Sequence, residues 1–259
     1  MLLKGLIITV STIIVGVAIL AYHPLPEGIE DRCSVHFIIG FVQLFRRIAS
    51  VAEFLGYGSI YRNIRFLDII PRPENPNTTF IGALKLDWDQ IVGVPVIIYQ
   101  PNDTSVLHPA IVFFHGGGWV VGKPDMNDRI TYLYAVATGT VIVNVEYRLA
   151  PEHPFPAPIQ DCLEVTRFIL RHGIQYNIDV TRVGVVGESA GGNLAAAVAL
   201  ALSREKSDLP PLLFQVLHFP PLQAFDMRLP SYIDLNHSMP ILTQNLMSAM
   251  YAHYMGVDS

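Results

Sequence analysis

The chain has 259 residues, of which 51% are hydrophobic and 15% are charged, with a formal net charge of −5. The charged fraction is well below the roughly 25% of average soluble chains, which argues against a disordered protein. Seventeen Lys and Arg residues against 22 Asp and Glu residues give no basic surface, so we expect no nucleic-acid partner. Two cysteines exclude a disulfide framework, and the sequence has no CxxC or HExxH motif that would indicate a metal site.

Residues 5–22 form a run of 18 residues without a charge. A helix of this length is about 27 Å long, which is close to the thickness of the hydrocarbon core of a bilayer. Lys4 precedes the run and three acidic residues lie within 23–31, so the positive-inside rule favours a lumenal body. We therefore predict a single-pass type II membrane anchor over 1–22. A signal peptide cleaved after Ala18 is the alternative, and both interpretations place the body in the secretory pathway.

Three Asn-x-Ser/Thr sequons fit that compartment, and their asparagines are Asn77, Asn102 and Asn236. Such triplets also occur by chance, so they are candidate glycosylation sites. In an oxidising lumen Cys33 and Cys162 could pair, but the alternative of two separate thiols is equally consistent with the sequence and we predict no bridge.

Apolar residues recur at three- and four-residue spacing within 35–56, which predicts an amphipathic helix. Two interpretations stay open: an ordinary helix packed on the core, or a lid or membrane-associated helix. A linker rich in Pro and Asn follows at 71–79.

After the linker, short β-rich runs alternate with helical patterns. The expected strands are 94–99, 110–114, 140–146, 183–186 and 212–219, and the expected helices are 128–137, 160–172, 190–203 and 238–255. This alternation predicts βαβ units and a mostly parallel sheet, and the continuous apolar character of the strands predicts helices on both of its faces.

A GxSxG motif, Gly187-Glu188-Ser189-Ala190-Gly191, lies between the expected strand 183–186 and the expected helix 190–203. This strand–turn–helix setting is the one that a nucleophile elbow requires. Ser189 is therefore the candidate nucleophile on a strained turn, and the two glycines leave room where a side chain would collide. The less specific interpretation is a glycine-rich connection in which a serine caps the helix.

A second glycine-rich motif, His115-Gly116-Gly117-Gly118-Trp119, directly follows the expected strand 110–114. Its order relative to Ser189 matches the oxyanion loop and nucleophile of esterases and lipases. We expect the backbone N–H groups of Gly116, Gly117 and Ala190 to form the oxyanion hole. His115 is not expected to be the general base, because the base follows the serine in this class, and it should shape the loop together with Gly118.

Three motifs of the chain together resemble the arylacetamide deacetylase-like branch of the hormone-sensitive-lipase group of α/β-hydrolases. They are HGGGW at 115–119, YRLAPEHPFPAP at 147–158 and GESAGGNLAAAV at 187–198. The resemblance extends over essentially the whole chain. It implies an α/β-hydrolase fold and a serine hydrolase of hydrophobic carboxylic esters or amides that needs no cofactor. It also implies anchorage in the endoplasmic reticulum membrane. Glu188 stands where the family usually has Asp, which keeps the carboxylate.

The resemblance further implies that the residues before the linker and those after Pro221 build a helical cap over the site. The expected parts are a membrane anchor at 1–22, an N-terminal cap region and linker at 23–80, a partial α/β-hydrolase core at 81–221 and a cap segment at 222–259.

A serine nucleophile needs a histidine base that is oriented by a carboxylate, and in this fold both follow the serine. The 259 − 189 = 70 residues after Ser189 offer no such pair after a recognisable later strand. His218 lies in the expected strand 212–219, where we expect it to be buried. Asp226 and His237 are a poor candidate pair for the triad, because neither follows a recognisable later strand. We therefore expect that the sequence is incomplete at the C-terminus and that this form is nearly inactive.

Two alternatives from other classes remain. The first is a non-catalytic protein of the hydrolase fold that binds a small apolar ligand under its cap. The second is a product that does not fold, because a parallel sheet without its final strands leaves an edge unpaired.

Overall fold

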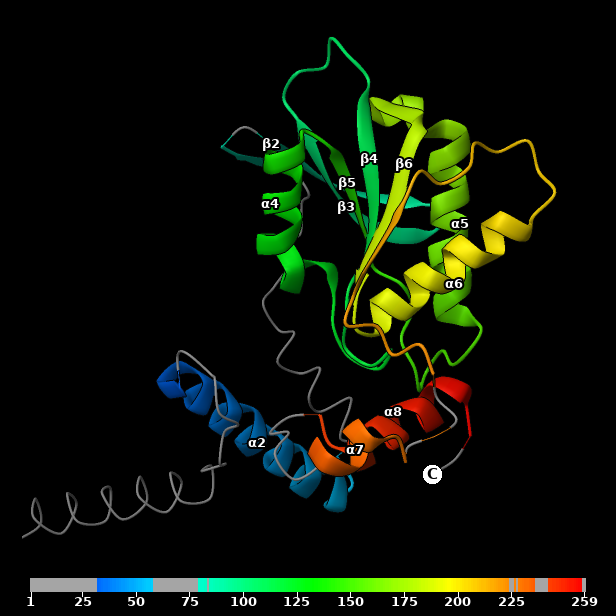
Figure 1. Ribbon diagram of the computed structural model, residues 1–259. Coiled ribbons are helices and arrows are strands. Elements are labelled where there is room, and N and C mark those ends of the chain that lie inside the picture. Colours follow the sequence, from blue (N-terminus) through cyan, green and yellow to red (C-terminus); the bar gives the residue numbers. More distant parts are fainter. Residues whose placement is uncertain are drawn as a thin grey trace, which may run out of the picture. The chain divides into compact units, whose positions relative to one another are not determined.

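The computed structural model describes residues 32–57, 79–82, 84–223, 226, 228–235 and 242–257 (Figure 1). The predicted anchor at 1–22, most of the predicted linker and the sequons at Asn77 and Asn236 lie outside these residues. By its internal contacts the chain divides into two compact units, residues 1–67 with 225–248 and residues 68–224 with 249–259.

The second unit is built on a seven-stranded sheet in the order β1-β2-β3-β5-β4-β6-β7. The strands are β1 (Thr79–Ile81), β2 (Leu84–Ile91), β3 (Val94–Pro101), β4 (His108–Phe114), β5 (Val141–Val145), β6 (Ile178–Glu188) and β7 (Gln215–His218). The sheet is mixed, not mostly parallel as predicted. Strands β5, β4, β6 and β7 are parallel, whereas β1, β2 and β3 form an antiparallel meander that joins β5 through β3.

The antiparallel part arises from strands β1 and β2, which we did not predict. A two-residue turn, Val92-Gly93, with φ of 49° and 83°, joins β2 to β3 and pairs Ile91 with Val94. Positive φ at both central residues is typical of the turns that match the twist of a hairpin. In β2 the residues Leu84 and Leu86 are buried and the alternation is visible in the sequence, so the period-two signal was available.

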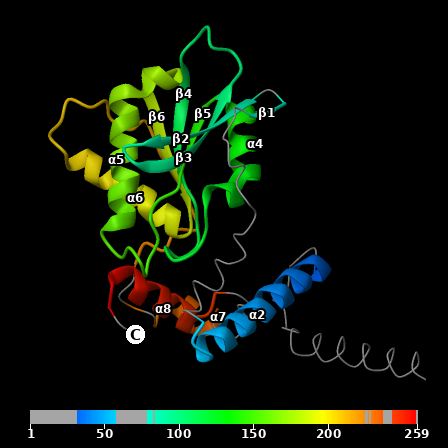
Figure 2. The same cartoon turned by 180° about the vertical axis from the view of Figure 1, so that it is seen from behind.

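Helices cover both faces of this sheet (Figures 1 and 2). They are α4 (Asp128–Thr138), α5 (Ala157–His172) and α6 (Ala190–Arg204), with short 3₁₀ turns η2 (Pro124–Asn127) and η3 (Gly173–Tyr176). Helix α5 begins three residues before its predicted start, because Pro158 is tolerated in the first turn of a helix.

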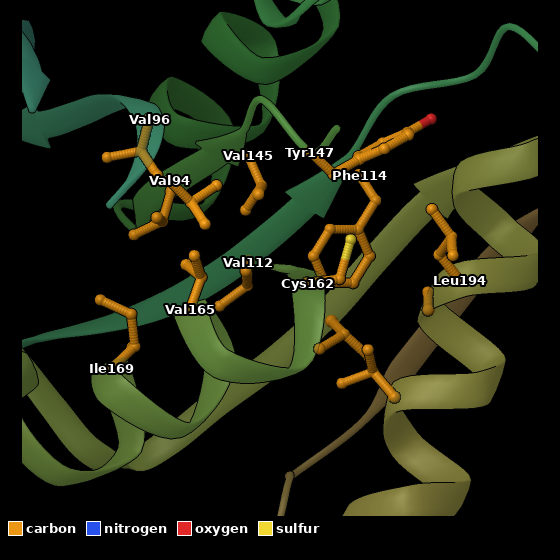
Figure 3. Close-up of a cluster of buried hydrophobic side chains, with 14 of the residues drawn as sticks. Val94, Val96, Val112, Phe114, Val145, Tyr147, Cys162, Val165, Ile169 and Leu194 are labelled. Carbon is orange, nitrogen blue, oxygen red and sulfur yellow. The ribbon is translucent and has the colours of Figure 1, made fainter. Parts of the chain in front are cut away.

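The two faces have separate cores, because neighbouring residues of a strand point to opposite sides. Val112 and Phe114 of β4 pack with residues of α5 and α6, including Cys162 and Leu194 (Figure 3). On the opposite face, Ile111 and Phe113 pack with residues of α4. The prediction of a sheet covered on both faces is confirmed.

The first unit contains α2 (Arg32–Phe54), α7 (Pro230–Leu235) and the start of α8 (Gln244–Met255), whose residues from Ala249 onwards belong to the second unit. Among the described ranges, no helix is both long enough and apolar enough to cross a membrane. The predicted anchor falls outside those ranges.

Candidate active site

Ser189 occupies the turn between β6 and α6. Its backbone has φ of 51° and ψ of −121°, a conformation that residues other than glycine rarely adopt. The turn is held from both sides, because the Ser189 N–H donates to the carbonyl of His218 at 2.9 Å and the Asn193 N–H donates to the carbonyl of Ser189 at 3.1 Å. Strain that is held in place in this way concentrates at functional residues.

The glycines of the motif allow three backbone segments to approach one another. A Cβ on Gly187 would lie 2.2 Å from the carbonyl oxygen of Gly191, and a Cβ on Gly191 would lie 2.0 Å from the carbonyl oxygen of Phe114. Neither position has room for any side chain, so the start of α6 packs directly on the ends of β4 and β6.

The glycine-rich loop after β4 meets this turn. A Cβ on Gly116 would lie 3.4 Å from the Cβ of Ser189 and 3.3 Å from the carbonyl oxygen of Glu188. The next residue, Gly117, has φ of 117°, and its carbonyl accepts a hydrogen bond of 3.0 Å from the Val121 N–H. The structure therefore places Gly116 beside Ser189, although the two residues are 73 positions apart.

His115 is fixed behind the loop. Its ring is buried and stacks on Tyr147 with the ring centres 4.3 Å apart, and its Nδ1 lies 2.7 Å from the carbonyl oxygen of Gly116. The Tyr147 hydroxyl donates to the His115 carbonyl at 2.7 Å. Burial lowers the pKa of His115 to about 4, so the ring is neutral at pH 7 and Nδ1 donates to Gly116. These contacts give His115 a role in shaping the loop.

Glu188 connects the turn to the segment that follows the loop. Its Oε1 accepts a hydrogen bond of 2.6 Å from the side-chain amide of Asn127, at the end of η2. The same oxygen would lie 3.3 Å from a Cβ on Gly116. The carboxylate therefore sits between the two motifs. Sequence reasoning missed Asn127, because its partner is 61 residues away.

The C-terminal half of α8 packs on the same loop. Trp119 is buried and stacks on Tyr254 with ring centres 4.6 Å apart, and Tyr251 lies 5.2 Å from Trp119 by the same measure. A Cβ on Gly118 would lie 2.2 Å from the Met250 sulfur, so the absence of a side chain at Gly118 lets Met250 pack there. The spacing of three between the two tyrosines could have indicated one aromatic face of a helix.

The 147–158 segment contacts the loop from a third side, because the Ala150 N–H donates to the Trp119 carbonyl at 2.9 Å. Arg148 makes a two-pronged ion pair with the nearly buried Asp161, at 2.7 Å from Nη2 to Oδ1 and 2.9 Å from Nε to Oδ2. The Arg148 N–H also donates to Asp161. Further on, the Phe155 N–H donates to the Tyr254 carbonyl at 2.6 Å, which links the segment to α8.

The residues that the sequence offered as the base and its carboxylate partner either contact groups other than Ser189 or lie outside the described residues. His218 is half-buried at the end of β7, so the expectation that it is buried was wrong, because the edge strand β7 pairs on one side with β6. Its Nε2 lies 2.6 Å from the hydroxyl of Tyr134 on α4. Asp226 is half-exposed and pairs with Arg228, and His237 lies outside the described residues. The hydrogen bonds of His108, His115 and His218 go to groups other than the Ser189 side chain.

Comparison with known proteins agrees with this geometry. The model of a family described as "alpha/beta hydrolase fold" matches residues 111–259. The chain is 35% identical to arylacetamide deacetylase of Oryctolagus cuniculus over 260 aligned positions, which cover 96% of this chain and 64% of the relative. It is 38% identical to the carboxylesterase NlhH of Mycobacterium tuberculosis over 172 positions, covering 66% of this chain and 53% of that enzyme.

Solved structures show the same likeness. A thermostable esterase from Pseudomonas putida superposes with a TM-score of 0.64 at 26% sequence identity, covering 82% of this chain and 67% of that chain. The present chain thus spans a little under two thirds of the length of the deacetylases that it matches. It belongs to the α/β-hydrolase fold family, and its similarity to the arylacetamide deacetylases extends over nearly the whole of this chain.

Proposed function

We propose that this chain carries the nucleophile and the oxyanion loop of a serine hydrolase of carboxylic esters or amides. The observation that supports this most directly is the strained backbone of Ser189 with Gly116 packed against it. Relatives named as esterases and deacetylases support the reaction class.

In the proposed mechanism the Ser189 hydroxyl attacks the acyl carbonyl carbon and gives its proton to a histidine base. The oxyanion that forms is stabilised by the N–H groups of Gly116, Gly117 and Ala190, and the N-terminus of α6 adds partial positive charge there. Collapse of this intermediate expels the alcohol or amine, which takes up the proton, and leaves an acyl-serine. Water then hydrolyses the acyl-serine with the same base.

We place the base and its carboxylate partner in sequence that the relatives have beyond the matched region. The 259-residue chain by itself should then be nearly inactive. The substrates are hydrophobic acyl esters or aryl amides, a class suggested by the apolar α2 and α8 and by the relatives' names, deacetylase and cholesterol ester hydrolase.

We also propose that residues 5–22 anchor the protein in the endoplasmic reticulum membrane with its body in the lumen, and that 23–80 and 222–259 contribute to a cap. Asn102 is exposed in the segment after β3, where a glycan can be accommodated, and Asn77 and Asn236 are the other glycosylation candidates.

A fluorophosphonate probe, which reacts with activated serines, tests this function. A longer form that includes a strand-end Asp followed by a His should be labelled at Ser189, whereas the 259-residue chain should be labelled weakly. Ser189→Ala should abolish labelling of the longer form, and Ser207→Ala, at an exposed serine, is the matched control. Ligand binding by the longer form without labelling or turnover would instead favour the non-catalytic alternative.

A further inference from the structure

Helix α2 exposes an apolar stripe along one face. Its members are Leu44, Ile48 and Val51 in the helix and Leu55 directly after it, whose N–H donates to the Val51 carbonyl at 3.0 Å; their exposed fractions are 39%, 55%, 58% and 61%. Their spacing of four, three and four residues places them above one another on one side of a helix. Among the side chains of α2 that the structure describes, Ile39 and Ala49 are 1% and 4% exposed and lie on the opposite side of the helix. The predicted amphipathic helix is therefore present, but the centre of its apolar face is exposed.

An exposed apolar stripe of this kind marks an interaction surface, because contiguous apolar surface in water is unfavourable. Two large aromatic side chains are exposed where α2 ends, since Phe54 is 89% and Tyr57 is 73% exposed. Aromatic residues of this type gather at the boundary between the hydrocarbon and the headgroups of a bilayer.

The charge around the stripe points to the same occupant. Residues 32–57 contain three Arg and one Glu, which gives 3 − 1 = +2, so the rest of the chain carries −5 − 2 = −7. A cationic amphipathic helix in an otherwise acidic protein is typical of binding to a surface of anionic lipid headgroups.

The position of α2 in the chain keeps it close to the predicted membrane anchor. Only nine residues, 23–31, separate the uncharged run 5–22 from the first residue of α2. Nine residues span at most about 30 Å when fully extended. If 5–22 crosses the bilayer, α2 is held within that distance of its surface, and its effective concentration there is high.

We propose that α2 lies flat in the headgroup region of the bilayer, with Leu44, Ile48, Val51 and Leu55 inserted among the acyl chains. The partner is a lipid surface, and the contact is additional to the anchor. The part of this inference that holds α2 near the bilayer rests on the proposed anchor. The inference does not depend on the proposed hydrolase reaction.

Single-site fluorescent labelling of the full chain tests this. Cys33 is exposed and is replaced by Ser, whereas Cys162 is fully buried and serves as the unlabelled background. An environment-sensitive probe is attached through Ile48→Cys in the stripe or through Ser50→Cys, an exposed position two residues away that points to another side of the helix. The protein is reconstituted in phosphatidylcholine vesicles with or without phosphatidylserine.

We expect the probe at position 48 to brighten several-fold and to be quenched by a doxyl group on the lipid acyl chains. The probe at position 50 should stay accessible to aqueous iodide, and phosphatidylserine should strengthen the contrast. Equal iodide quenching at both positions would overturn the inference. Shielding of position 48 from iodide and lipid alike would also overturn it, in favour of packing against protein.

Alkaline carbonate extraction of the same vesicles reports separately on the anchor. Protein that stays with the membrane while position 48 is not quenched by lipid contradicts only the inference about α2. Protein that is extracted contradicts the anchor, and the labelled variants then show in a vesicle-binding assay whether α2 associates with lipid without it.

Discussion

The side-chain amide of Asn127 donates a hydrogen bond of 2.6 Å to Oε1 of Glu188, across 61 residues of sequence. Asn127 ends the short 3₁₀ turn that follows the glycine-rich loop, and Glu188 directly precedes Ser189. The contact therefore joins the GxSxG motif to the segment that follows the HGGGW motif. A partly buried carboxylate is stable in such a place when a donor satisfies it.

We expect Asn127→Leu to destabilise the protein by about 1–3 kcal/mol, because the Glu188 carboxylate loses its donor in a partly buried place. Urea unfolding at pH 7 measures this. Glu164→Ala is the matched control, since Glu164 is exposed and its pair with Arg167 should contribute less than about 1 kcal/mol. Equal stability of Asn127→Leu and the parent would contradict the importance of this contact.

Gly191→Ala should prevent correct folding of the Ser189 turn or destabilise the protein by more than about 4 kcal/mol, because the new Cβ would lie 2.0 Å from the Phe114 carbonyl oxygen. Gly139→Ala is the control. Gly139 has positive φ, at 63°, but no atom lies within 4 Å of an added Cβ, so only about 1 kcal/mol of backbone strain is expected. Soluble yield and thermal unfolding compare the two variants, and similar losses would contradict a steric clash at Gly191.

His115 should make stability depend on pH. Its pKa is lowered by burial from 6.5 to about 4, so between these values the unfolded chain binds the proton and the folded protein does not. Its contribution is complete above pH 6.5 and is lost as the pH falls toward 4, in total about 3 kcal/mol. His115→Gln keeps a donor for the Gly116 carbonyl but cannot titrate. In urea unfolding at several pH values, the difference between parent and variant should therefore shrink or reverse as the pH falls, and a constant difference would argue against a buried neutral imidazole.

Asp161→Ala should destabilise the protein by about 2–3 kcal/mol, because it removes four hydrogen bonds of Arg148 and leaves the Arg148 backbone N–H without its acceptor. The expected loss of stability is at the lower end of the range for buried ion pairs, because the Arg148 side chain is half-exposed and can be hydrated without its partner. Asp179→Ala, at a more exposed carboxylate paired with Arg182, should destabilise the protein less. The free energy of unfolding from urea titrations separates these cases, and equal losses would contradict the structural role of Asp161.

Several elements could be predicted from local pattern. The runs that became β3, β4 and β5 are continuous and apolar, and the alanine-rich run after Ser189 became α6. The strand–turn–helix setting of Ser189 was likewise readable, because its glycines mark where backbones must approach. Strands β1 and β2 were missed because the Val92-Gly93 turn lacks the usual Asn or Asp, although Leu84 and Leu86 alternate with polar residues in β2.

The sequence by itself determined the two glycine motifs, their order and the expectation that a serine would be strained on a turn, because these follow from short-range steric requirements. Only the tertiary structure decided which distant groups hold that turn: Asn127 on Glu188, Met250 on Gly118, and Tyr134 on His218. Such contacts depend on how strands order themselves in a sheet, which local periodicity does not encode. For α2, the spacing of apolar residues determined that the helix has an apolar face, whereas only the structure showed that Leu44, Ile48 and Val51 on this face stay exposed.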